Sequence, residues 1–240
     1  MPEGCGASLR YRLRTGIGPV RARVCGVFLV TLIGLSACRV SSPPLARFPE
    51  PVLDASLAAK RDLEAAVFAG GCFWGVEAVF EHVKGVVNVV SGYSGGSAAT
   101  ASYALVSRGA TEHAESVHVL YDRAQISYGQ LLKIFFAVAH DPTQLNRQGP
   151  DRGTQYRSAI FYTSLEQQRI ASGYIGQLEN AEVFKGRIVT ALAPLMAFHE
   201  AEAYHQDYAS RHPDQLYILL HDAPKVARLK SACRACMWRG

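Results

Sequence analysis

The 240-residue sequence has little excess charge outside its N-terminus, which argues against a nucleic-acid-binding protein. Its net charge is +5, but the first 37 residues carry +4 of it and the rest of the chain is nearly balanced. No basic stripe interleaved with aromatic residues follows, so we expect no nucleic-acid partner. At 49% hydrophobic and 19% charged residues, without an internal repeat, the composition predicts one globular domain with a sizeable core.

Two local patterns lack the residue that their chemistry would need. Gly92-Tyr93-Ser94-Gly95-Gly96 has no lysine and no clear helix start after it, so it indicates a turn rather than a phosphate-binding loop. His199-Glu200 begins like the helix of a zinc protease, but Ala203 occupies the position of the second histidine. We therefore interpret residues 197–211 as an ordinary helix and expect no bound metal.

The N-terminus lacks an apolar run long enough for a mature membrane span. Arginines precede the short apolar run Val24–Leu35, and this order is typical of an export signal. The run ends at Leu35-Ser36-Ala37-Cys38, which resembles a bacterial lipobox, where cleavage precedes a cysteine that is then lipidated. We expect residues 1–37 to be a lipoprotein-type signal peptide and Cys38 to be the lipid anchor. An ordinary signal peptide with a chance cysteine, or a retained anchor, stays open.

The remaining chain divides by composition. Ser41–Pro51 is rich in proline and shows neither helix nor strand periodicity, so we expect residues 38–62 to be a lipidated tether. The folded domain is predicted at 63–222 and a C-terminal tail at 223–240.

Cysteine is too scarce for a disulfide framework. Cys5 and Cys25 lie in the predicted signal, and Cys38 is the expected lipid site. The exported protein would keep three thiols, which indicates reactive rather than purely structural use. These thiols are Cys72, Cys233 and Cys236.

The most informative stretch is Gly71-Cys72-Phe73-Trp74-Gly75. It follows the apolar run Ala65–Ala69 and precedes the apparently helical Val76–Phe80, so the pattern predicts strand, glycine turn and a cysteine at the first turn of a helix. Unpaired N–H groups and the helix dipole favour a thiolate there. A buried structural cysteine beside core aromatics is the alternative.

Strands and helices alternate through the domain without a uniform βαβ repeat, which predicts an α+β fold with a mixed sheet and helices packed on it. A long polar loop, residues 142–154, interrupts the pattern. Strands are predicted at 65–69, 86–91, 115–121, 157–162 and 187–192, and helices at 72–80, 102–107, 127–140, 164–179, 197–211 and 225–232.

Five ordered blocks of residues resemble the A-type peptide-methionine sulfoxide reductases, over about residues 65–220. They are Gly71–Glu77, His113-Ala114-Glu115, Asp141-Pro142-Thr143 with Arg147-Gln148-Gly149, Asp151–Ser158 and Tyr204–Tyr208. The resemblance implies a single domain with a ferredoxin-like α/β sandwich core. It also implies thiol-dependent reduction of methionine S-sulfoxide, protein-bound or free, through a cysteine sulfenic acid.

The resemblance also implies roles for individual residues. Cys72 would be the nucleophile, and Phe73 and Trp74 would hold the substrate methyl group. Glu115 would be the acid, with its pKa raised by burial. Two tyrosines and an aspartate of the family's substrate site correspond to Tyr103, Tyr156 and Asp151.

From the residues alone, blander interpretations stay open. Glu115 could be a solvated carboxylate at a strand end. Tyr103 and Tyr156 could be core or interface residues, and Asp151 could cap its loop.

Family members often carry resolving cysteines near the C-terminus, so Cys233 and Cys236 are candidates for reducing the sulfenic acid. However, Tyr217–Val226 stands where other members have a glycine-rich, cysteine-bearing tail. Incidental thiols, or half of a metal site, are the alternatives. No bound cofactor is expected, and electrons would come from an external thiol, such as a thioredoxin-like donor.

Two rival functions remain at this stage. Cys72 could serve a cysteine hydrolase, with a histidine base chosen from His113, His118, His199 and His205. A lipid-tethered binding module that kept only the reductase fold is the non-enzymatic alternative. We expect a monomeric reductase that repairs oxidised proteins in the cell envelope. It would be periplasmic and held to a bacterial membrane by its lipid alone; because Arg39 follows Cys38, we favour the outer membrane.

Overall fold

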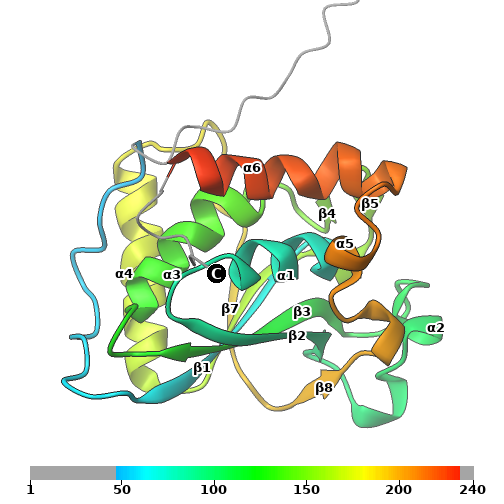
Figure 1. Cartoon of the computed structure of the whole chain (residues 1–240), viewed down its shortest axis with the longest axis horizontal. Helices are drawn as coiled ribbons and strands as arrows, with labels where there is room; N and C mark the ends of the chain where they lie inside the picture. Colours follow the sequence, from blue (N-terminus) through cyan, green and yellow to red (C-terminus); the bar gives the residue numbers. More distant parts are fainter. Residues whose placement is uncertain (1–46, 233–240) are drawn as a thin grey trace, which may run out of the picture. The chain divides into compact units, whose positions relative to one another are not determined.

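The computed structural model describes residues 47–232, which form a mixed α+β fold around one six-stranded sheet (Figure 1). The strand order is β7-β6-β1-β3-β2-β8, with β6 and β7 parallel and the other neighbours antiparallel. This confirms the predicted fold class. The strands are β1 (Leu63–Gly70), β2 (Val86–Ser94), β3 (Ala114–Asp122), β6 (Ser158–Tyr162), β7 (Ala191–Pro194) and β8 (Phe198–Glu200), and β4 (Arg147–Gln148) pairs with β5 (Asp151–Arg152) separately.

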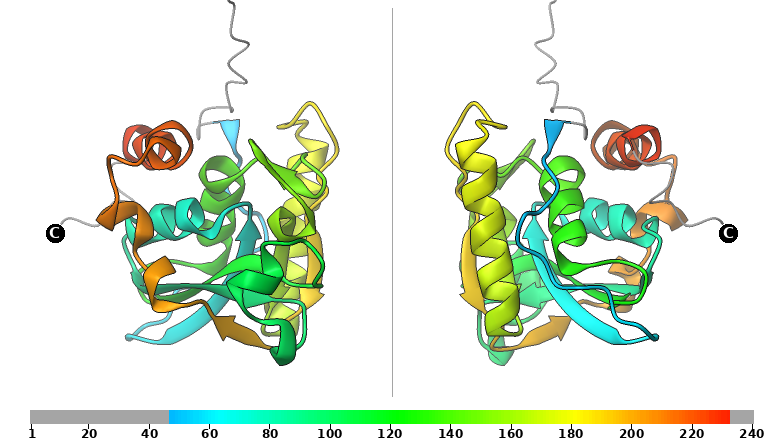
Figure 2. Two further views of the ribbon diagram at one scale, coloured as in Figure 1. Left: turned by 90° about the vertical axis from the view of Figure 1, so that its right-hand side faces the viewer. Right: turned by 90° about the vertical axis from the view of Figure 1, so that its left-hand side faces the viewer.

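The helices pack in layers beside the sheet. Helix α1 contacts β2 and β3, and α6 lies over α1 on the side away from these strands (Figures 1 and 2). The α-helices are α1 (Phe73–Glu81), α2 (Tyr103–Val106), α3 (Tyr128–Ile134), α4 (Leu165–Asn180), α5 (Tyr208–Arg211) and α6 (Ala223–Ala232). Two π-helical turns, Phe135–Ala139 and Ile218–Asp222, extend α3 and lead into α6. Among the helices at 47–232, none combines the length and apolar character of a membrane span.

The junction of β1 and α1 depends on a glycine. Gly71 has φ +93°, a left-handed conformation that glycine adopts without the steric cost of a Cβ. A Cβ there would also lie 2.5 Å from Cγ of Gln148. The turn therefore sends the chain from the buried strand directly into α1 and brings β4 close to it.

Local signals fix the start of α3 as predicted. The Ser127 side chain accepts a hydrogen bond from the Gln130 amide, and the Gln130 side chain accepts one from the Ser127 amide. This reciprocal capping box satisfies two backbone donors. The extended helix ends at Ala139, before Asp141-Pro142, because the residue before a proline disfavours helical geometry.

The helix predicted at 197–211 is wrong. The segment forms β8, a 3₁₀ turn at Ala203–His205 and the short helix α5. The Gln206 side chain bonds both the amide and the carbonyl of Ser91, and Asp207 has φ +52°. Pairing with the edge of β2 therefore overrides the local helical pattern.

The turn predicted at Gly92–Gly96 begins later than expected, because β2 continues to Ser94. A Cβ at Gly92 would overlap the His199 carbonyl and the Phe198 ring, so glycine at this position lets β8 approach β2. The chain turns at Gly95, where φ is +97°. The strand predicted at 187–192 is also shifted, since β7 covers Ala191–Pro194.

Residues just before β1, in the predicted tether, lie against the domain. Phe48 is 2% exposed and makes an edge-to-face contact with Phe184. The Asp54 carboxylate accepts hydrogen bonds from the Ser127 hydroxyl and the Gly129 amide. Packing thus begins upstream of Leu63, where the sequence pattern placed the start of the domain.

Candidate active site

Cys72 is the N-cap residue of α1, at the end of the glycine turn, as predicted. It is a free thiol with 8% of its surface exposed. Burial raises the pKa of the thiol well above its usual value, and the nearby Glu115 and Asp222 raise it further. The Trp74 amide and Lys225 oppose this shift. The helix start does favour a thiolate, since the Trp74 amide lowers the pKa of the thiol, but burial outweighs this effect.

Glu115 lies on β3 and faces the start of α1. It is 2% exposed, and its Oε2 accepts a hydrogen bond from the Phe73 amide at 3.1 Å. Burial raises the Glu115 pKa to about 8, Asp151 adds to the rise, and hydrogen bonds from the Phe73 amide and the Cys72 side chain oppose it. The solvated alternative for Glu115 is excluded, and the carboxyl holds a proton at neutral pH.

Phe73 and Trp74 lie in a cluster of aromatic rings. Phe73 is fully buried, and its ring centre is 4.9 Å from that of His205. The Trp74 ring stacks on Tyr208 at 3.8 Å and meets the edge of Tyr217 at 6.0 Å. These ring contacts gather Phe73, Trp74, Tyr208 and Tyr217 into an aromatic wall that begins directly after Cys72 in the chain.

The two predicted substrate tyrosines lie close to the same carboxyl group. Burial is the largest cause that raises the pKa of Tyr103 and of Tyr156, and Glu115 is the second for both. Both side chains are half-buried. Two neutral hydroxyls thus share the surroundings of Cys72 and Glu115.

Asp151 lies on β5, in the polar loop. Its carboxylate accepts a 2.5 Å hydrogen bond from the Tyr217 hydroxyl. Tyr217 in turn touches Trp74. The loop is thereby connected to the aromatic wall, and Asp151 has a partner from a distant element rather than only a role within its own loop.

Several residues that organise this site were not assigned roles from the sequence. Oε1 of Glu202 accepts the Tyr103 amide at 2.9 Å and Oε2 accepts the Tyr93 hydroxyl at 2.9 Å. His205 Nδ1 accepts a hydrogen bond from Trp74 Nε1 at 3.2 Å. His205 and Tyr208 belong to the block Tyr204–Tyr208 that the sequence singles out. The helix predicted there gave no indication that their rings pack against Trp74. The sequence marks Tyr217 only as the first residue of the segment that departs from the family's tail.

The histidines proposed for a hydrolase have other partners. His113 Nε2 lies 2.9 Å from the Ser97 carbonyl, and the His118 ring packs on Phe198. His199 sits in the β2–β8 pair, and His205 is bonded to Trp74. The acid beside Cys72 is a carboxyl, so the arrangement does not favour the cysteine hydrolase.

Three predicted residues fall outside the part of the chain that the structure describes. They are Cys38, the expected lipid site, and Cys233 and Cys236, the candidate resolving thiols. Within the described part, residues 47–232, no group of three or more His, Cys, Asp or Glu side chains is arranged to hold a metal ion.

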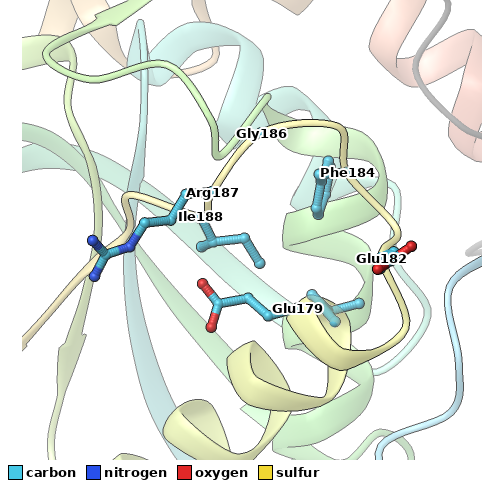
Figure 3. Close-up of a pocket in the computed structure, with 7 residues that line it drawn as sticks. Glu179, Glu182, Phe184, Gly186, Arg187 and Ile188 are labelled. Atoms are coloured by element: carbon cyan, nitrogen blue, oxygen red, sulfur yellow. The ribbon is translucent and has the colours of Figure 1, made fainter.

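A separate pocket of about 220 Å³ lies at the end of α4 (Figure 3). Glu179, Glu182, Phe184, Arg187 and Ile188 line it. Its lining contains neither a cysteine nor any residue predicted for the site.

The family comparison matches most of the folded chain. Residues 64–235 match the model of the peptide methionine sulfoxide reductases. Peptide methionine sulfoxide reductase MsrA 2 of Synechocystis sp. is 55% identical over 184 residues, which cover 76% of this chain and 86% of that protein. The corresponding enzyme of Deinococcus radiodurans is 50% identical over 167 residues, covering 70% and 81%.

Two solved structures resemble the fold. Reduced Mxr1 of Saccharomyces cerevisiae has a TM-score of 0.59 and 31% identity, and covers 68% of this chain and 91% of that one. Methionine sulfoxide reductase A of Corynebacterium diphtheriae has a TM-score of 0.55 and 35% identity, covering 72% and 86%.

Proposed function

Because this chain belongs to the peptide methionine sulfoxide reductase family, we propose that it reduces the S-epimer of methionine sulfoxide, in proteins or as the free amino acid, through a sulfenic acid on Cys72. Membership makes the chain a methionine sulfoxide reductase, an oxidoreductase. The observation that carries the finer proposal is the pairing of one buried thiol with one protonated carboxyl, Glu115, beside an aromatic wall.

Substrate binding follows from the shape of the sulfoxide. Its methyl group is apolar, and methyl groups and sulfur both pack well on aromatic rings, so Phe73 and Trp74 would hold this end. Its oxygen is a strong acceptor, and the hydroxyls of Tyr103 and Tyr156 would donate to it. Asp151 would orient the substrate backbone from the loop. The sulfoxide sulfur is a stereocentre, so a site that fixes the positions of the methyl group and the oxygen accepts one epimer.

The reaction transfers one oxygen atom from substrate to enzyme. Glu115 gives its proton to the sulfoxide oxygen as Cys72 Sγ attacks the sulfoxide sulfur. The S–O bond breaks, and the oxygen ends on Sγ as a sulfenic acid while methionine leaves. The proton from the Cys72 thiol restores Glu115. Sulfoxide and thiol thus become methionine and sulfenic acid, with no other reactant.

Turnover of separated sulfoxide epimers tests this proposal. The full chain is assayed with each epimer of a methionine sulfoxide peptide and excess dithiol, with Cys72→Ser as control. We expect turnover of the S-epimer alone and none by Cys72→Ser. Equal rates on both epimers, full activity in Cys72→Ser, or ester hydrolysis without reduction would overturn it.

Regeneration requires a thiol that reaches the sulfenic acid. We assign this step to Cys233, followed by exchange with Cys236 and then with a thioredoxin-like donor. Mass spectrometry after a single addition of substrate checks the assignment. A Cys72–Cys233 disulfide is expected, whereas a Cys233–Cys236 bridge alone, or no bridge, contradicts direct resolution by the tail.

The cellular place is proposed from the N-terminal sequence alone. Cleavage before Cys38 and lipidation would tether a monomeric enzyme to the periplasmic side of a membrane, where it would repair oxidised envelope proteins. Fractionating cells that express the full chain or Cys38→Ser tests the anchor. The wild-type protein should sediment with membranes and Cys38→Ser should not; identical fractionation of the two argues against lipidation.

A further inference from the structure

The C-terminal helix places a charged pair against the first turn of α1. The Lys225 ammonium lies 3.2 Å from Oδ1 of Asp222, and both side chains are largely buried, at 16% and 1% exposed. Lysine and aspartate are rarely buried unless paired with an opposite charge. The two charges are therefore held by each other inside the fold, not by solvent.

The absence of a side chain at Gly75 lets the Asp222–Lys225 pair lie close to the start of α1. A Cβ at Gly75 would lie 2.5 Å from Lys225 Nζ and would overlap Asp222 Oδ1. Cys72 is the N-cap of the same helix, three residues earlier. The ammonium therefore lies about one helical turn from Cys72, close enough to lower the pKa of the thiol. At that distance in a buried region, salt screens the interaction little.

Two carboxyl groups near Cys72 oppose a negative charge on its sulfur, whereas the Trp74 amide and Lys225 favour one. Glu115 faces the sulfur from β3, and Asp222 faces it from the turn before α6. The hydroxyls of Tyr103, Tyr156 and Tyr217 complete the groups that interact with it. Lys225 is the cation among these neighbours, and it also faces the buried His140.

Asp222 explains why the lysine stays in place. Its Oδ1 contacts Lys225, while its Oδ2 is buried and has no hydrogen-bond partner among residues 47–232. An unpaired carboxylate there would disfavour a second negative charge on Cys72. Lys225 offsets part of this effect, since it lowers the pKa of the Cys72 thiol while Asp222 raises it by more.

We propose that Lys225 is a positioning residue for the reaction at Cys72: held by Asp222 against the first turn of α1, its ammonium stabilises the thiolate and sets the reactivity of the cysteine. The inference deepens the proposed function, since it rests on Cys72 as the attacking group. It also assigns a role to Tyr217–Val226, the segment that departs from the family's glycine-rich tail.

Alkylation of Cys72 by iodoacetamide tests the proposal without using the sulfoxide reaction. Rates are measured on the full chain from pH 6 to pH 10, by mass spectrometry of the peptide that contains Cys72. Lys225→Met should slow alkylation at pH 7 by about tenfold, because each unit of pKa changes the thiolate fraction tenfold. Lys225→Arg should stay close to wild type. Lys230→Met, on the exposed side of the same helix, is the matched control and should have no effect.

A substitution at Asp222 should have the opposite effect on the alkylation rate. Asp222→Asn should speed alkylation relative to wild type, because it removes a negative charge while its amide oxygen can still accept the hydrogen bond that holds Lys225. The double variant should lie between the two single variants. Equal profiles for Lys225→Met and Lys230→Met would overturn the proposal.

Two further results distinguish a folding defect, a failure of this proposal and a failure of the proposed function. If Lys225→Met does not fold, as judged by circular dichroism, Lys225→Gln takes its place, and a rate equal to wild type overturns the proposal. If Cys72→Ser retains reductase activity while Lys225→Met still slows alkylation, the proposed function fails and the electrostatic coupling stands.

Discussion

Glu115 and Cys72 are both buried acids, and burial acts on the two in the same direction. A charge in a low-dielectric site is costly, so burial raises the pKa of both groups and favours their protonated forms. For a sulfoxide reductase this state is useful, because the oxygen needs a proton and the thiol supplies the one that restores the acid. The site therefore favours a protonated Glu115 and a protonated Cys72, which are the two proton donors that the proposed reaction uses.

The raised pKa of Glu115 predicts the alkaline limit of activity. A carboxyl with a pKa of about 8 is protonated below that pH and loses its proton above it, so kcat/KM should fall as pH rises through about 8. Glu115→Gln should lower kcat/KM by roughly 100-fold or more at pH 7, because the amide cannot transfer a proton.

Steady-state kinetics from pH 6 to pH 10 measure both effects. Glu166→Gln, an exposed residue of α4, serves as the control and should follow wild type. A wild-type rate that stays constant through pH 9, or a Glu115→Gln variant of normal activity, would remove Glu115 from the role of acid.

At the scale of elements, the β8–α5 segment decides how the site is built. It is a short edge strand followed by turns. It supplies His205 and Tyr208 to the aromatic wall, and Glu202 to the Tyr103 amide. Its position depends on pairing with β2 and on the Gln206 bonds to Ser91. The site is thus completed by contacts between elements distant in sequence.

Gly92→Ala tests this dependence. The added methyl group would overlap the His199 carbonyl, so β8 must move and we expect a loss of roughly 1–3 kcal/mol in the free energy of unfolding. Reductase activity should fall as well, because the support of Tyr103 and Trp74 moves with β8. Urea denaturation and steady-state kinetics measure the two effects.

Gly176→Ala is the matched control for this substitution. It lies within α4 and a Cβ there would meet nothing within 4 Å, so the same chemical change should stabilise the protein by up to about 1 kcal/mol and leave activity unchanged. If the two variants behave alike, the approach of β8 to β2 does not depend on Gly92.

At the scale of the whole molecule, segments outside the central sheet close the fold. The stretch before β1 packs Phe48 into the core and binds the start of α3 through Asp54. At the C-terminal end of the described residues, α6 buries Leu229 and packs on α1. Both ends of the described chain therefore contribute to stability, and the C-terminal end also reaches the site.

Phe48→Ala measures the contribution of the upstream stretch. Because Phe48 is 2% exposed and contacts Phe184, removing its ring should cost about 3–5 kcal/mol. Val52→Ala, at a side chain 88% exposed in the same stretch, should change stability by less than about 0.5 kcal/mol. Chemical denaturation of the full chain compares them, and similar midpoints for both variants would show that the stretch is not part of the cooperative unit.

Local sequence determined the elements whose signals are local. Alternation and apolar runs located β1, β3 and β6, the Ser127 capping box and Ser164 located the starts of α3 and α4, and the glycine turn located Cys72 at the start of α1. These features depend on backbone preferences and neighbouring side chains, which a sequence displays directly. The ordered blocks around Cys72, Glu115 and Asp151 likewise indicated the family that the comparisons show.

Tertiary structure alone decided what depends on distant neighbours. Whether Glu115 is solvated or protonated, whether residues 197–211 form a helix or an edge strand, and which hydroxyl binds Asp151 were all set by packing between elements. The same holds for Lys225, whose proximity to Cys72 follows from the placement of α6 over α1. Burial and charge proximity are properties of three-dimensional neighbours, and they fix the protonation states on which the chemistry depends.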